Sequence, residues 1–354
     1  MEKAKKFLNY ILIDGLSGMT LGLFATLIIG TIIKQIGSYV PGVLGNYLVI
    51  IGQVASSVTG AGVGCGVAYK FKESPLVTFS AAVCGMVGAF ASKLIAGTVF
   101  VEGVIQYAGP GEPLGAYIAA LAGITVGRLV AGKTKVDILV TPLVTITAGS
   151  ALGILFGPPI AGFMTWLGGI VNWSTQRQPF LMGIFVSVIM GIVLTLPISS
   201  AALGLILNLS GIAAGAATVG CCANMIGFAV ASFRENGWGG FFAQGIGTSM
   251  LQMPNIIKKP AIWLPAIITS AVLGPVSTVV LRMENNATGS GMGTSGLVGQ
   301  LMTYEVMTQT QAPAIVLGKI VLLHILLPGV IALGVSELMR RRGLIQEGDM
   351  KLEV

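Results

Sequence analysis

Apolar runs near the length of a bilayer crossing recur along the whole sequence, and the few charged residues lie mostly at their flanks. A helix needs about 20 mainly apolar residues to cross the hydrocarbon of a bilayer. Only 9% of the residues are Asp, Glu, Lys or Arg, against roughly 25% in an ordinary soluble domain. A water-soluble fold could not cover its surface with so few charges. We therefore expect an all-α, multi-pass membrane protein surrounded by lipid.

About ten apolar segments are long enough to be read as transmembrane helices. The first follows a short basic head, but its apolar core is too long for a secretory signal, so we expect it to be retained. The segments cover residues 10–36, 46–69, 75–98, 114–132, 136–158, 179–205, 209–233, 239–257, 261–282 and 312–338.

The basic residues predict the orientation, because Lys and Arg are enriched in cytoplasmic loops. If every segment crosses once, most basic clusters fall on one side, whereas three arginines (Arg177, Arg234 and Arg282) fall on the other. The clusters are Lys3/Lys5/Lys6, Lys70/Lys72, Arg128/Lys133/Lys135, Lys258/Lys259 and Arg340/Arg341/Arg342. We expect a cell-membrane protein with both termini cytoplasmic. The net charge of +7 is scattered rather than gathered on one face, so no nucleic-acid binding is expected.

The two halves of the sequence resemble each other weakly. Residues 21–24 match residues 182–185, and residues 63–65 match residues 219–221. Five crossings per half would insert the second half upside down, which is the inverted-repeat plan of many secondary transporters. Chance similarity between glycine-rich apolar segments is the alternative. The repeat predicts an N-terminal transmembrane repeat, an inverted C-terminal repeat and a cytoplasmic tail, at residues 1–172, 173–339 and 340–354.

Two glycine-rich stretches, residues 244–252 and 289–300, share the pattern G-x-G-T-S followed by a glutamine. Irregular backbone at membrane depth is tolerated only when it is buried in protein or lines a water-filled cavity. A helix break there would expose amide N–H groups beside hydroxyls, which suits hydroxylated or anionic solutes. We expect broken helices or re-entrant hairpins in the interior, the alternative being a polar loop at residues 284–300.

Polar residues embedded in apolar segments complete the candidate site. Gln53 and Asn224 lie in the second and seventh segments, which are repeat partners. His324, the only histidine, is either structural or proton-sensitive. The four cysteines lack metal or redox spacing, so we predict no catalytic residue, metal or cofactor. The predicted solute-binding residues are Asn285, Asn286, Thr294, Ser295, Thr248, Ser249, Gln244, Gln53 and Asn224.

Residues 293–300, with Asn285 and Asn286 before them and about ten spans around them, resemble the EIIC membrane proteins of the sugar phosphotransferase system. The resemblance covers nearly the whole chain and is closest to the EIIC-like, toxin-regulator-like branch. It implies a homodimer in which a scaffold portion holds the partner and a mobile portion carries the substrate in an elevator motion. The Gly-Ile-Thr-Glu motif of sugar-transporting EIIC proteins is absent, because Gly123-Ile124-Thr125 is followed by Val126. Coupled phosphorylation is therefore not supported by an intact motif.

Three functions remain open at this point. The first is a transporter of a small polar hydroxylated or anionic metabolite, such as a sugar or sugar acid. The second is a membrane-embedded ligand sensor or regulator, although the short tail of mixed charge at residues 340–349 offers little docking surface. The third is a phosphotransferase permease that works with separate soluble EIIA and EIIB partners. In the first two cases the protein is not an enzyme.

Overall fold

The computed structural model describes residues 10–107 and 109–352, and the protein is 79% helical. The predicted all-α fold is confirmed. The described residues divide into two compact units, the first ending at Phe163 and the second beginning at Met164. This division lies nine residues before residue 172, where the sequence-based boundary remains a prediction. The basic head that contributed to the predicted orientation lies outside the described residues.

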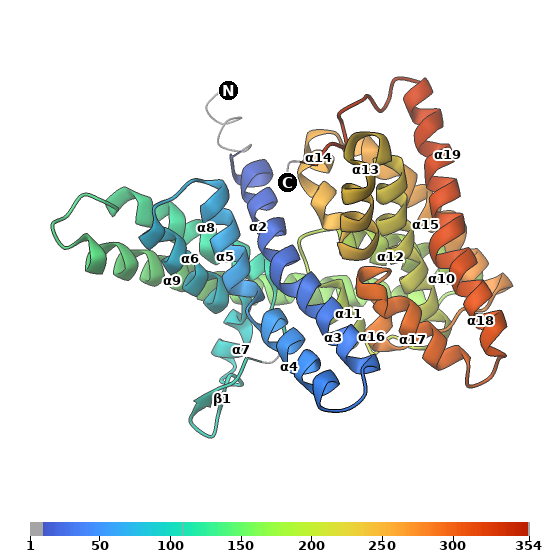
Figure 1. Ribbon diagram of the computed structural model, residues 1–354, viewed down its shortest axis with the longest axis horizontal. Coiled ribbons are helices and arrows are strands. Elements are labelled where there is room, and N and C mark those ends of the chain that lie inside the picture. The colour runs from blue at the N-terminus through green and yellow to red at the C-terminus, as the bar shows by residue number, and fades with distance from the viewer. Residues whose placement is uncertain (1–9, 108, 353–354) are drawn as a thin grey trace. The chain divides into compact units, whose positions relative to one another are not determined.

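The first unit is a set of helices joined by short connections and one small hairpin that projects from them (Figure 1). Its α-helices are α2 (Leu16–Leu23), α3 (Ile29–Tyr39), α4 (Val43–Ser57), α5 (Thr59–Lys70), α6 (Pro75–Ala89), α7 (Ala91–Ile95), α8 (Pro113–Val130) and the start of α9 (Asp137–Thr175). Two π-helical turns, η1 (Tyr10–Gly15) and η2 (Phe24–Ile28), flank α2, and strands β1 (Phe100–Val101) and β2 (Val104–Ile105) pair antiparallel.

Glycine allows the helices of this unit to approach closely. Helices α2 and α5 pack together, and a Cβ atom added at Gly22 would collide with the backbone carbonyl of Gly62. Small residues at such contacts let helix backbones approach in a membrane, where packing rather than the hydrophobic effect holds helices together. The high glycine content is therefore explained here by packing.

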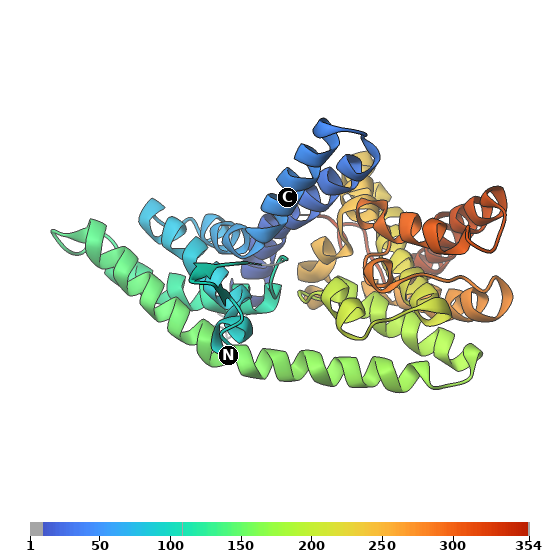
Figure 2. The same ribbon diagram turned by 90° about the horizontal axis from the view of Figure 1, so that it is seen from below.

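Helix α9 is a single 39-residue helix that contains the division between the units (Figure 2). We predicted an end near residue 158, but the helix continues through Pro158 and Pro159 to Thr175. The uncharged sequence that follows the prolines has no stop signal before Gln176 and Arg177.

The second unit contains more short and irregular elements. Its α-helices are α10 (Pro179–Thr195), α11 (Ser200–Ile206), α12 (Gly211–Ala231), α13 (Phe233–Phe242), α14 (Met253–Lys258), α15 (Leu264–Pro275), α16 (Ala287–Ser290), α17 (Val298–Met307), α18 (Pro313–Ile320) and α19 (Leu327–Arg341). Its π-helical turns are η3 (Ala243–Gly247), η6 (Val276–Val280) and η8 (Val321–Leu326), and its 3₁₀ turns are η4 (Ser249–Gln252), η5 (Pro260–Trp263) and η7 (Ser295–Leu297).

Helix α12 is the centre of the second unit. It packs against α10, α15 and α19, which lie around it in Figure 1. From Ala214 to Ala231 every residue except Val230 is buried, as expected for a helix that is apolar on all sides. Adjacent to it, a hydrophobic core joins α12, α15, α17, α18 and η8 through Val219, Leu273, Met283, Met307, Val316, Ile320 and Leu323.

Six helices within the described residues are long and apolar enough to cross a membrane, or seven if α4 and α5, bent by 53°, form one span. The other expected segments correspond to the shorter apolar helices α6 and α10 and to the interrupted stretch from α13 to α14. A polytopic membrane fold is therefore supported, and the number ten remains a prediction.

Candidate functional site

The first glycine-rich stretch interrupts the helix that precedes it. After η3, Thr248 adopts an extended conformation (φ −160°, ψ 141°), and its Oγ1 accepts a hydrogen bond of 3.2 Å from the N–H of Met250. Thr248 therefore caps η4. Gln244, Thr248 and Ser249 are all buried. The expected helix break is present, and it is sheltered inside the second unit.

The second glycine-rich stretch is also irregular and mostly buried. Asn286 caps α16, because its Oδ1 accepts a hydrogen bond of 3.0 Å from the N–H of Gly289. Gly293 has a φ of +52°, and a Cβ at this position would press on the backbone of α12 at Cys221. Leu297 has a φ of +59°, an unfavourable conformation for a bulky residue. Such backbone strain is concentrated at functional sites.

The two breaks meet within the second unit. Turns η3 and η7 pack against each other, and both stretches pack on α12, which contacts η3, η4 and α16. Thr294 and Ser295, from the second break, are as buried as their counterparts Thr248 and Ser249. The shared pattern therefore places two Thr-Ser pairs in one interior region.

Asn224 lies in α12 with its amide fully bonded. Its Oδ1 accepts from Trp263 Nε1 at 2.9 Å and Thr195 Oγ1 at 3.2 Å, and its Nδ2 donates to Gly220 O at 3.1 Å and Ser270 Oγ at 3.2 Å. Thr195 in turn lies 2.8 Å from Ser249 Oγ. An amide can make four hydrogen bonds, so Asn224 has no capacity left for a solute.

The side-chain amide of Asn285 is also hydrogen-bonded to other residues of the chain. Its Nδ2 donates to Thr218 Oγ1 at 2.7 Å and to Gly299 O at 3.0 Å, and its Oδ1 accepts from the N–H of Asn286 at 2.8 Å. These bonds tie the start of the second stretch to α12 and to the start of α17. Gln244 similarly donates to Ser232 and Gly240 and accepts from Gln252. These amides hold the two breaks in shape.

A different group of buried polar atoms has no hydrogen-bond partner among the residues that the structure describes. Four of these atoms, Ser295 Oγ, Gln300 Oε1, Thr303 Oγ1 and His324 Nε2, belong to η7, α17 and η8, and others are Ser150 Oγ, Ser277 Oγ and Arg340 Nε. All four side chains are at most 7% exposed. Unpaired buried polar groups cost free energy, so their presence calls for a partner such as water or a ligand. The four atoms on η7, α17 and η8 are therefore candidates for contact with a bound molecule.

Within this group, Gln300 lies beside His324. Its Nε2 donates to Cys222 Sγ at 3.2 Å and lies 3.3 Å from His324 Nδ1. With this amide orientation, Nδ1 accepts and the ring proton is on Nε2. His324 then offers an unused donor, and Gln300 offers an unused acceptor at Oε1. A hydroxyl group, which both donates and accepts, matches this pair.

The predicted site residues therefore separate into distinct roles and places. Gln53 lies on α4 of the first unit with its side chain exposed, whereas the others belong to the second unit. Sequence reasoning quoted Gln300 only as the end of the motif and missed Thr303, which follows it by three residues and so shares a helix face. The glutamine at a fixed place after the glycines was the available signal.

The comparisons with known proteins agree with this architecture. Residues 13–352 match the family model described as "Phosphotransferase system, EIIC". No curated protein matches the chain. Because the family match covers nearly the whole chain and several apolar helices accompany it, a multi-pass membrane protein is shown. The chain therefore belongs to the EIIC family of the phosphotransferase system, whose EIIC domains transport sugars together with soluble EIIA and EIIB components.

Proposed function

We propose that this protein carries a small neutral, hydroxylated solute of the sugar class, and that the solute binds in the second unit between the two glycine-rich breaks. The observation that carries the proposal is the group of unpartnered polar atoms on Ser295, Gln300, Thr303 and His324. None of these side chains is an Asp, Glu, Lys or Arg. Neutral donors and acceptors fit hydroxyl groups better than a carboxylate or phosphate.

The amides with completed hydrogen bonds have a supporting role in this proposal. Asn224, Gln244 and Asn285 hold the breaks, while the Thr-Ser pairs and the unpartnered group face the solute. Substrate sites of transporters with broken helices are built in this way, from irregular backbone near the middle of the membrane.

We also propose an elevator mechanism in a homodimer, and the division into two units supports the elevator part of this proposal. All proposed site residues except Gln53 belong to the second unit, which has its own core around α12. A site contained in one unit can move with it as a rigid body. The inverted repeat is supported by its placement, since its matched segments lie on α2 and α5 in one unit and on α10 and α12 in the other, and each pair packs together. We propose cytoplasmic termini on the basis of the charge distribution.

The test uses purified protein and a panel of hexoses, hexitols and aldonic acids, screened by thermal stabilisation because a ligand of the folded state raises its stability. For a sugar or hexitol that stabilises the wild type, Ser295→Ala and Gln300→Ala should each weaken binding about tenfold, the value of roughly one hydrogen bond. Ser295→Ala should leave the melting temperature of the free protein unchanged, because Ser295 Oγ has no hydrogen-bond partner among the described residues.

Gln309→Ala is the matched control for Gln300→Ala, because Gln309 lies just beyond the same helix with an exposed side chain. It should bind as the wild type does. Stabilisation by aldonic acids alone would contradict the neutral-solute assignment. Unchanged affinity in both Ser295→Ala and Gln300→Ala would remove these residues from the site.

A further inference from the structure

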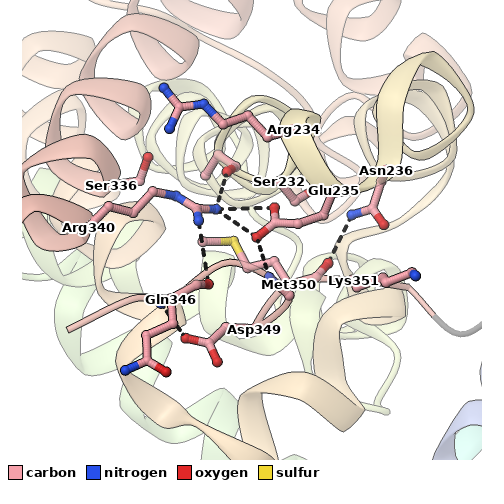
Figure 3. A network of polar contacts seen from close by, with 12 residues as sticks. Ser232, Arg234, Glu235, Asn236, Ser336, Arg340, Gln346, Asp349, Met350 and Lys351 are labelled. Atoms are coloured by element: carbon pink, nitrogen blue, oxygen red, sulfur yellow. Dashed lines mark hydrogen bonds and ion pairs between the residues drawn. The ribbon is translucent and has the colours of Figure 1, made fainter. Parts of the chain in front are cut away.

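The C-terminal tail folds back onto the second unit after α19 ends at Arg341. Residues 342–352 lie against α13, η4 and α14, and Figure 3 shows the polar contacts that hold part of this segment. Ile345 is 2% exposed and Met350 is fully buried. A short tail of mixed charge would be expected to remain in water. This one is packed as part of the fold.

Side-chain amides form hydrogen bonds with the backbone of the tail. Asn236 binds it twice, donating from Nδ2 to Met350 O and accepting at Oδ1 from the N–H of Leu352, both at 2.8 Å. Asn255 Nδ2 donates to Lys351 O at 2.9 Å. These contacts recognise backbone atoms, so they fix the path of the tail.

One ion pair holds the same segment, and a second joins the end of α19 to α13 beside it. Arg340 lies 2.9 Å from Glu235 Oε1 (Figure 3). The same carboxylate oxygen accepts a hydrogen bond of 3.3 Å from the N–H of Gly348 in the tail. Lys259 lies 2.6 Å from Asp349 Oδ2. The tail is therefore attached to α13 at one place and beyond α14 at another.

One glutamine connects the tail to the first glycine-rich break. Gln252 Nε2 donates to Met350 O at 2.9 Å and also to Gln244 Oε1 at 2.9 Å. Its Oε1 accepts from Asn255 Nδ2 at 2.9 Å. Both amide protons of Gln252 are thus used, one on the tail and one on the residue that opens the break. Losing the tail contact would leave Gln252 without one of the bonds that orient it.

We propose that the docked tail is a positioning element for the first glycine-rich break, acting through Gln252 and Gln244. This proposal rests on the proposed function only where it predicts a change in solute affinity. The tail's effect on the break is a property of the protein without solute, and it is tested in that state.

The test is amide hydrogen exchange of the full-length protein in detergent without solute, comparing wild type with Asn236→Ala. This substitution removes two hydrogen bonds to the tail and none to the break. We expect exchange in residues 345–352 to rise about 30-fold, from roughly fivefold per hydrogen bond lost. Exchange in residues 244–252 should also rise, by about fivefold or more, while residues 289–300 remain unchanged as an internal control.

Lys259→Met is the second variant, because it releases the tail at a different place. Glu337→Gln is the matched control, since the Arg234–Glu337 pair (3.1 Å) joins α13 and α19 without touching the tail. It should change neither segment. The proposal would be overturned if both tail variants showed faster exchange in the tail but unchanged exchange in residues 244–252. So would a tail whose exchange is unaffected by either substitution.

If the panel yields a solute, its affinity tests this inference separately from the proposed function. Asn236→Ala should then weaken its binding several-fold, with Ser295 and Gln300 intact. Coupled exchange without any solute in the panel would leave the positioning role standing and count against the transport assignment alone.

Discussion

Replacing Asn285 with alanine tests whether this residue is scaffold or solute contact. The substitution removes three hydrogen bonds, to Thr218 Oγ1, to Gly299 O and from the N–H of Asn286. Hydrogen bonds contribute about 0.6 kcal/mol on average inside membranes and up to about 1.5 kcal/mol in soluble proteins. Three of them amount to about 2 to 4 kcal/mol.

For a unit of this size, about 2 to 4 kcal/mol corresponds to a fall in melting temperature of roughly 5 to 15 °C. The assay is thermal unfolding in detergent followed by tryptophan fluorescence, with solute binding measured well below the transition. Asn286→Ala is the matched control, because it loses mainly one capping bond and should cost about 1 kcal/mol. A variant at Asn285 that melts as the wild type does but no longer binds solute would refute the scaffold assignment.

Two further predictions concern packing and pH. Gly220→Ala should destabilise the protein by about 1 to 3 kcal/mol or more, because its Cβ would collide with the backbone of α10. A Cβ added at Gly334 on α19 has no neighbouring atom within 4 Å. Gly334→Ala should therefore stabilise the protein by up to about 1 kcal/mol, which unfolding midpoints would show. Burial alone would raise the pKa of Asp349, but its bonds to Lys259 and a backbone N–H, with the charge of Arg340, outweigh burial and lower it. Tail docking, followed by hydrogen exchange, should therefore be complete at pH 7 and weaken only below about pH 4, and Asp349→Asn should weaken it already at pH 7.

Local sequence rules predicted the elements that depend on local chemistry. The glycines before Thr248 and Thr294 disfavour regular helix, and the surrounding lipid disfavours exposed backbone, so the sequence predicted buried breaks, with a polar loop as the alternative for the second. The long apolar runs likewise predicted most helices. The end of α9 was missed because proline usually stops a helix, whereas here the helix continues past Pro158 and Pro159.

The division of the polar residues into bonded and unbonded ones could not be read from the sequence. Whether an amide is saturated depends on residues far along the chain: Asn285 bonds to Thr218, and Gln300 lies beside His324. The same limit applies to the tail. Its charges are visible in sequence, but the side-chain amides that bind its backbone come from Asn236, Gln252 and Asn255, about 100 residues earlier.

This division has a physical reason in a membrane protein. An unpaired polar group in a low-dielectric interior is costly, so a solute site can be kept open only if the surrounding structure holds it without help from the solute. Asn224, Gln244 and Asn285 complete their hydrogen bonds within the chain and so fix the two breaks. In the proposed site, Ser295 and Gln300 can then keep unpaired atoms, and a bound hydroxyl group would relieve their free-energy cost. Under this proposal, that relief adds to the free energy of solute binding, provided that the scaffold amides remain paired.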